Sequence, residues 1–456
     1  MHMLYRVLRI LIIFLILLGL FSLFFIKIVD RSDYQSSDFY KKMTQRLDSI
    51  DREDYKSVGD TIKVGWAKSS LIPDFQLPLA GFEKRKGQKF TGIKDSIWVK
   101  TFVIDNGIRK LAFITLDLLI VPPDVTQMVL HKVSNFGFNP HDIYFAATHT
   151  HSSTGGWAQG YIGEIFAGTY HKKTTTILSK AILKSLENAS FDLQKASFGY
   201  SAVHASDQVT NRLVGDAEGT IDPWLRFVKF QKEDGSVAIL CSYSAHATCL
   251  SYTNSEISAD YPGALCNTLE ATEQISFVGF AAGAMASMAP LSAKKNGNDK
   301  IDDLATNLSE QLRLVQNFTP TSYDSILSAQ RLKLELGAPQ WRINKYFCIR
   351  PWVFNSLFDE QHSDITSLRI GNIVFIGVPF DFSGELVEPL ELYARSKNLH
   401  IVITSFNGGY NGYVTKDQWY DRDHYETRVM NWYGPYLGSY ISEMIKTQID
   451  IYAENY

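Results

Sequence analysis

Two histidines separated by one residue have the type and spacing to do chemistry. His149 and His151 lie in the stretch ATHTHSSTGGW, residues 147–157, of a chain with 11 histidines among 456 residues. In extended backbone, residues i and i+2 point to the same side, about 6.5–7 Å apart by strand rise. Both imidazoles can therefore face one cavity, as in a metal centre or a nucleophile–base pair. The alternative is a pair of partly exposed loop histidines.

Three distant segments offer further polar side chains. His246, in SYSAHATCL, ends an apolar strand, where an imidazole either faces a cavity or is a hydrogen-bonded core residue. Asp381 follows a strand that ends in Val-Pro, a position that is also typical of a helix N-cap. Residues 407–426 are rich in tyrosine, glycine and aspartate. A site that uses all of these groups must be assembled by the fold.

Common local motifs are absent from the sequence. It contains no P-loop GxxxxGK[ST] and no GxGxxG after a strand, which excludes the usual nucleotide-binding fingerprints. It also lacks the GxSxG elbow of α/β-hydrolases and the HExxH helix of zincins. A net charge of -3 supplies no basic field for nucleic acid. A zinc site built from distant segments remains compatible with these absences.

Short β-branched and aromatic runs alternate with amphipathic stretches along most of the chain. Strands are predicted at 97–105, 110–121, 142–149, 225–232 and 236–247, with a hairpin-like pair at 367–379. Helices are predicted at 122–137, 173–189 and 301–317. This alternation predicts an α/β fold with a mixed β-sheet core flanked by helices.

The N-terminal region has a different composition. Residues 10–26 are 17 uncharged, almost wholly apolar residues, preceded by Arg6 and Arg9. Their length nearly matches a bilayer core of about 30 Å, and the preceding charges favour a cytoplasmic N-terminus. We therefore expect one transmembrane signal-anchor, with the rest of the chain on the non-cytoplasmic (periplasmic or extracellular) side of the membrane. A cleaved signal peptide is the alternative.

The composition suggests a division into three parts. Residues 1–30 form the expected anchor, 31–60 a polar stalk, and 61–456 the catalytic domain. The chain has four cysteines, too few for a disulfide framework of this length, although an exported location permits one or two bridges.

The order of several segments resembles the neutral/alkaline (non-lysosomal) ceramidase family. These segments are VGWAKSSLIPDFQLPLAGF, ATHTHSSTGGW, TNR, SAHATCL, SADYPG, VPFD and NGYVT…HYE. The resemblance runs from about residue 61 to 440 and leaves no room for the immunoglobulin-like C-terminal domain of longer members. It implies a zinc-dependent amidase that cleaves the N-acyl bond of ceramide, or of a related N-acyl lipid, into a fatty acid and a sphingoid base.

The resemblance also implies a metal-ligand set. His149 and His246 would supply imidazoles, Asp381 a carboxylate where the family has glutamate, and Tyr413 a phenol. Zinc with such ligands keeps a position for water and can lower the pKa of that water to about 7.

Three further residues would act on the scissile amide. The resemblance places His151 and Tyr425 beside it and lines the site with Arg212 of the TNR motif. These groups suit proton transfer and stabilisation of an oxyanion. Asp260, in SADYPG, would have a structural or supporting role.

The stretch GAMASMAP, residues 283–290, departs from the family pattern Gly-Asp-x-Ser/Asn-Pro. Aligned on Pro290, it places Ser287 at the aspartate and Ala289 at the serine or asparagine. Attack by an activated water needs no serine. This departure and Asp381 motivate two alternatives: a catalytically inactive or weakened lipid-binding envelope protein, and a zinc hydrolase of another amide or ester.

Overall fold

Two β-sheets form the centre of the computed structural model, which describes residues 2–50, 57–358 and 363–453. Within those residues, an eight-stranded sheet has the order β13 (Phe277–Ala282), β11 (Val237–Tyr243), β10 (Trp224–Lys232), β8 (Gln194–His204), β3 (Lys63–Ser70), β5 (Trp98–Asp105), β6 (Lys110–Leu116), β7 (Ile143–Ala147). A five-stranded sheet has the order β2 (Ser57–Val58), β15 (Ile326–Lys333), β17 (Asp364–Ile370), β18 (Ile373–Gly377), β20 (His400–Thr404). Both sheets mix parallel and antiparallel pairs.

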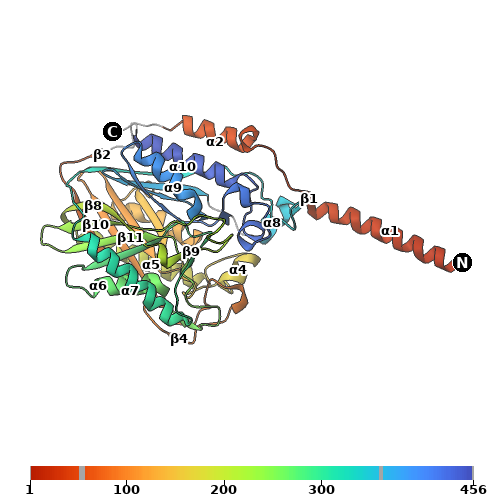
Figure 1. The fold of residues 1–456 in the computed structure, drawn as a ribbon, viewed down its shortest axis with the longest axis horizontal. Coiled ribbons are helices and arrows are strands. Elements are labelled where there is room, and N and C mark those ends of the chain that lie inside the picture. The colour runs from red at the N-terminus through yellow and green to blue at the C-terminus, as the bar shows by residue number, and fades with distance from the viewer. Residues whose placement is uncertain (1, 51–56, 359–362, 454–456) are drawn as a thin grey trace.

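Helices cover the sheets on both outer sides (Figure 1). The eight-stranded sheet packs against α3 (Pro123–Leu130), α5 (Lys172–Phe191), α6 (Asp260–Glu270) and α7 (Gly297–Gln316). The five-stranded sheet packs against α2 (Asp38–Asp48), α9 (Val387–Arg395) and α10 (Leu437–Ala453). A third apolar cluster fills the space between the two sheets. The predicted mixed-sheet α/β core with flanking helices is therefore confirmed.

The predicted elements lie where their patterns indicated. The apolar spacing of 173–189 forms α5, which buries Leu178, Ile182 and Leu186 against the sheet. The stretch predicted as one helix over 122–137 forms two pieces. Helix α3 ends at Leu130, and a separate 3-10 turn (Val133–Phe136) follows it.

Short elements complete the fold outside the two large sheets. They are β1 (Ile26–Ile28) paired with β16 (Phe347–Ile349), β4 (Gly92–Ile93) with β12 (Glu256–Ile257), β9 (Val209–Asn211) with β14 (Met288–Pro290), β19 (Asp381–Phe382) with β21 (Tyr413–Val414), and the helices α4 (Tyr161–Ala167) and α8 (Pro351–Leu357).

The eight-stranded sheet is strongly bent, and this bend assembles the site. Strands β3 and β8 share only two residue pairs, so the sheet opens at its middle. Its two ends approach each other: β13 lies against β7, and the Thr115 hydroxyl of β6 donates a hydrogen bond to the Phe280 carbonyl of β13. The loops that follow β7 and β11 therefore meet, although these strands are far apart in the strand order.

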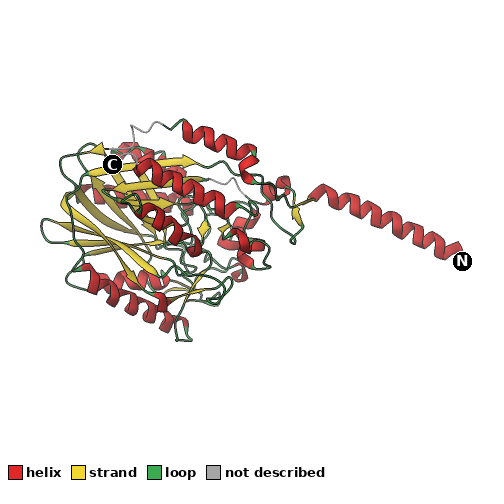
Figure 2. Ribbon diagram, turned by 45° about the horizontal axis from the view of Figure 1, so that its top comes forward, coloured by secondary structure: helices red, strands yellow, loops and turns green. Residues whose placement is uncertain are grey.

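The N-terminal helix α1 (His2–Phe25) projects away from the body (Figure 2). The predicted transmembrane helix is not supported, because no helix in the described part of the chain combines the length and the apolarity needed to cross a bilayer. In the expected stalk, α2 packs on the body through Met43, which is fully buried. The four cysteines are free and buried, without a disulfide.

Candidate metal centre

The four predicted metal ligands come from the eight-stranded sheet and from the short two-stranded sheet of β19 and β21. His149 follows β7 and His246 follows β11, so the bend of the eight-stranded sheet brings them together. Asp381 and Tyr413 begin β19 and β21, which pair in parallel with these two residues as direct partners. The structure thus places all four predicted ligands in one region, where the edges of the two sheets meet.

Backbone carbonyls orient the two buried imidazoles. Nδ1 of His149 donates to the carbonyl of Leu119 at 2.6 Å, and Nδ1 of His246 donates to that of Met285 at 3.0 Å. The Nε2 atoms therefore point at each other, 3.0 Å apart. Burial lowers the pKa of His149 to about 3 and holds the pKa of His246 well below its usual value. Both rings are neutral, the form that binds metal, and such outer hydrogen bonds fix the tautomer.

The histidine loop is held in a costly backbone conformation. His149 has φ 60° and Phe406 has φ 66°, the left-handed region that non-glycine residues rarely adopt. Their rings stack at 3.9 Å with an interplanar angle of 7°. The buried guanidinium of Arg85 donates to the carbonyls of Ala80, at 3.0 Å, and His151. Sequence reasoning missed Arg85 and Phe406, because no motif connects them with the histidines.

His151 completes a cluster of three imidazoles. Its Nε2 lies 3.1 Å from Nε2 of His149, and Phe82 packs on its ring at 4.7 Å between centroids. The ligand atoms of His149, His151 and His246 all lie within 4.8 Å of one another. His151 differs from the other two because it is partly exposed, whereas His149 and His246 are buried.

Asp381 has the features of a carboxylate that lacks its cation. It is fully buried, and neither oxygen makes a well-formed hydrogen bond to the described residues. Burial raises its pKa to about 7, although Arg212 and the nearby hydroxyl of Tyr413 oppose the shift. Oδ2 lies 3.6 Å from Nε2 of His246. Tetrahedral zinc with bonds of about 2.0–2.1 Å separates its ligands by about 3.3 Å. The donor set and spacing therefore fit a zinc-sized cation.

Arg212 connects the phenols to a second carboxylate. Its Nη2 donates to the hydroxyl of Tyr413 at 3.2 Å, and its Nε lies 3.0 Å from Oε1 of Glu426. The rings of Tyr413 and Tyr425 lie 6.1 Å apart. Glu426 was not predicted, although it directly follows Tyr425 in the HYE segment. The predicted residues Arg212 and Tyr425 thus adjoin the metal centre.

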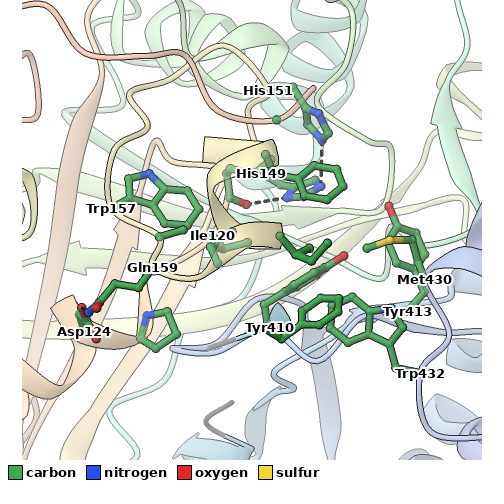
Figure 3. A pocket seen from close by; sticks show the side chains of 18 of the residues that line it. Ile120, Asp124, His149, His151, Trp157, Gln159, Tyr410, Tyr413, Met430 and Trp432 are labelled. Carbon is green, nitrogen blue, oxygen red and sulfur yellow. Dashed lines mark hydrogen bonds between the residues drawn. The ribbon is translucent and has the colours of Figure 1, made fainter. Parts of the chain in front are cut away.

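An apolar cavity leads to the cluster (Figure 3). It encloses about 980 Å³, including the space at its open mouth. Its apolar wall is formed by Leu119, Ile120, Pro123, Trp157, Ala158, Ile162, Phe166, Phe358, Met430 and Trp432. His149, His151, Tyr413 and Tyr425 also line it. Among the described residues that line the cavity there is no serine, threonine or cysteine.

Residues 283–290, which depart from the family pattern, lie beside the site without placing a nucleophile in the cavity. Ser287 is buried and shares a 2.5 Å hydrogen bond with Ser383. Ala289 lies in β14 opposite Thr210. Asp260 accepts hydrogen bonds from the backbone amides of the loop after His246, which agrees with the supporting role expected for it.

Known proteins resemble this chain in sequence. Residues 73–307 match the family described as neutral/alkaline non-lysosomal ceramidase, N-terminal. A neutral ceramidase of Pseudomonas aeruginosa is 27% identical over 192 residues, which are 39% of this chain and 28% of that protein. A neutral ceramidase of Mycobacterium tuberculosis is 21% identical over 197 residues, 39% of this chain and 31% of that protein. The matches thus cover only about a third of the relatives' own length or less.

The fold likeness extends further than the sequence match. The crystal structure of neutral ceramidase from Pseudomonas aeruginosa has a TM-score of 0.74 at 17% identity and covers 88% of this chain and 75% of that one. A structure described as ceramidase complexed with C2 also has a TM-score of 0.74, at 16% identity, and covers 88% and 76%. Because the family match spans more than half of the residues and includes the three clustered histidines, this chain belongs to the neutral/alkaline non-lysosomal ceramidase family.

Proposed function

We propose that this protein is a zinc-dependent hydrolase that cleaves the N-acyl amide bond of ceramide or a related N-acyl lipid. The observation that carries the proposal is the fully buried carboxylate of Asp381, which makes no well-formed hydrogen bond to the described residues and lies beside neutral imidazoles at the end of an apolar cavity. Leaving such a carboxylate without a partner is costly, and a bound cation removes that cost. The family supplies the reaction class.

His149, His246, Asp381 and Tyr413 would hold the ion. Zinc bound there would lower the pKa of a water molecule and polarise the amide carbonyl. The carbonyl partners of His149 and His246 keep both Nε2 atoms directed at the ion. Arg212, through its hydrogen bond to Tyr413, keeps the phenol oriented toward the same region.

His151, Arg212 and Tyr425 would act on the amide. His151 is neutral because burial lowers its pKa, and its partial exposure to the cavity allows it to accept and return a proton. Arg212 stays charged and Tyr425 stays a neutral phenol, because burial raises the pKa of that hydroxyl. Both are therefore donors for the charge that develops on the carbonyl oxygen.

The apolar wall of the cavity supports a lipid substrate, since side chains such as Ile120, Ile162 and Trp432 suit a hydrocarbon chain. The lining offers no aliphatic hydroxyl or thiol among the described residues, so water is the proposed nucleophile.

Two measurements on the purified protein test this function. We expect zinc near one equivalent and hydrolysis of N-acyl sphingosine. Zinc without hydrolysis of N-acyl sphingosine, but with turnover of short-chain N-acyl amides or esters, would identify a hydrolase of another bond. Absence of zinc would contradict the proposal and favour an inactive lipid-binding protein.

We further propose that the domain acts on the non-cytoplasmic side of the membrane. The support is the order of charges, since Arg6 and Arg9 precede the apolar run of residues 10–26, as in export signals. A reporter that is active only after export, fused behind the full chain, should be active.

A further inference from the structure

The loop that carries Tyr425 has little regular structure of its own. Residues 420–429, here the tyrosine loop, end in a single π-helical turn (Tyr425–Val429), a conformation that is rare and found mostly at functional sites. Tyr425 is 41% exposed at the cavity, so its own packing does not fix its position. Bonds within the loop, such as that from the Thr427 hydroxyl to the carbonyl of Arg422, shape the turn, and contacts from outside the loop place it against Tyr413.

Arg342 ties the two ends of the tyrosine loop together. Its guanidinium is 4% exposed and donates from Nη2 to the carbonyls of Tyr420 and Thr427, the latter at 2.6 Å. It also lies 3.8 Å above the ring of Tyr420. A buried guanidinium bonded to two carbonyls is rigid, because both carbonyls and the charge lose their partners if the loop opens.

The N-terminal segment, residues 26–31, holds the same loop from the other side. Its strand β1 pairs with β16, and Val29 is buried in a small cluster with Cys348 and Tyr420. Arg31 forms a 2.6 Å ion pair with Asp421 and donates at 2.9 Å to the carbonyl of Lys345. Residues far from the site in sequence therefore contact the loop directly before Tyr425.

We propose that the N-terminal segment and Arg342 are positioning elements for Tyr425. They act through the loop and touch neither the cavity nor the metal ligands. The rate of amide hydrolysis therefore depends on the contacts of residues 26–31 with the tyrosine loop. A disturbance of this segment loosens Tyr425 without releasing zinc. The catalytic consequence rests on the function proposed above, whereas the effect on loop opening does not.

Hydrogen exchange on the full-length, zinc-loaded protein tests the proposal. Asp421→Asn removes the carboxylate charge that pairs with Arg31 and that lies 3.7 Å from Nη1 of Arg342, whereas Asp421→Glu keeps that charge. Exposed ion pairs contribute little to stability. Exchange of the loop amides should therefore rise about 2- to 5-fold in the Asn variant and return toward the wild-type rate in the Glu variant. Arg342→Lys loses the paired hydrogen bonds from Nη2 to the carbonyls of Tyr420 and Thr427. It should raise exchange of the loop amides about 10-fold or more. The matched control is Arg46→Ala, which breaks a 2.5 Å pair between α2 and Glu335 away from the loop.

Kinetics provide the second readout. With N-acyl sphingosine, Asp421→Asn and Arg342→Lys should lower kcat with little change in KM and none in zinc content, while Arg46→Ala leaves all three unchanged. Unchanged exchange of residues 420–429 in both loop variants would overturn the proposal. So would a faster-exchanging loop whose variants turn over at the wild-type kcat. If the wild-type enzyme has no amidase activity, faster exchange still supports the positioning of the loop, and the function proposed above is what fails.

Discussion

The eight-stranded sheet and the short β19–β21 sheet contribute unlike halves to the site. The half from the eight-stranded sheet, His149 and His246, is complete without a ligand: both rings are buried, and each has a carbonyl partner at 3.0 Å or closer. The half from the two-stranded β19–β21 sheet and the loop after it is incomplete, because both oxygens of Asp381 lack well-formed hydrogen bonds to the described residues and Tyr425 lies partly exposed. The contrast indicates that the imidazoles are preorganised and that the carboxylate depends on the cation.

The first prediction removes the preorganised half. His149→Ala and His246→Ala should each lose zinc and activity by more than about 100-fold, since loss of an outer partner of a ligand alone costs 10- to 100-fold. Zinc content by mass spectrometry and amidase assays measure both. The control is His400→Ala. It removes an imidazole of β20 that stacks on Tyr200, and it should keep both zinc and activity. Retention of zinc by either site variant would contradict the ligand assignment.

The second prediction separates His151 from its neighbours. His151→Ala should keep zinc and lower kcat about 10²- to 10⁴-fold, the range of a lost general acid–base. The imidazole of His151 is partly exposed, unlike the two assigned ligands. Loss of zinc in this variant would show that His151 is a ligand, which its 3.1 Å distance to His149 would then explain.

The third prediction concerns the incomplete half. Burial raises the folded-state pKa of Asp381 to about 7, so the folded protein binds more protons than the unfolded chain between about pH 4 and 7. In the metal-free protein this carboxyl contributes stability at low pH that is lost as pH rises through 7. The free energy of unfolding of wild type, relative to Asp381→Asn, should therefore fall across this range by about 1.4 kcal/mol per pKa unit.

Urea denaturation of both proteins at pH 5, 6, 7 and 8, with chelator present, measures this difference. Titrating groups away from Asp381 are common to both proteins, so the difference reports on Asp381 and on His246, which lies 3.6 Å from it. When zinc is added to wild type, the difference in unfolding free energy between the two proteins should no longer depend on pH. Parallel stability curves without zinc would mean that Asp381 is not protonated in the folded protein.

The smallest effect is expected from the ring that supports His149. Phe406→Leu removes the stacking partner but keeps the carbonyl hydrogen bond, so zinc affinity should fall about 3- to 10-fold, at the low end for an outer partner. Competition with a zinc chelator measures it. The control, Phe230→Leu in the cluster between the sheets, should leave affinity unchanged. An equal loss in both variants would point to general destabilisation.

Local patterns predicted most of the secondary structure, because apolar periodicity and turn residues act over a few residues. The helix over 173–189 and the strands at 97–105 and 225–232 were found this way. The split of 122–137 was not, since the apolar spacing continues across the break. Arg85, Phe406, Arg342 and Glu426 carry no local signal. These residues matter because they contact carbonyls, rings and charges of segments that are distant in the sequence and adjacent only in the folded chain.

The sequence alone determined the chemical inventory: two histidines at a spacing of two, a third histidine and an aspartate after apolar strands, and a tyrosine-rich segment in the family's order. The tertiary structure decided which of them meet. The strands before His149 and His246 lie far apart in the sheet order, and only its bend joins them, while the separate two-stranded β19–β21 sheet supplies Asp381. The physical reason is that residue type and periodicity are local, whereas a metal centre requires atoms from distant segments within a few ångströms.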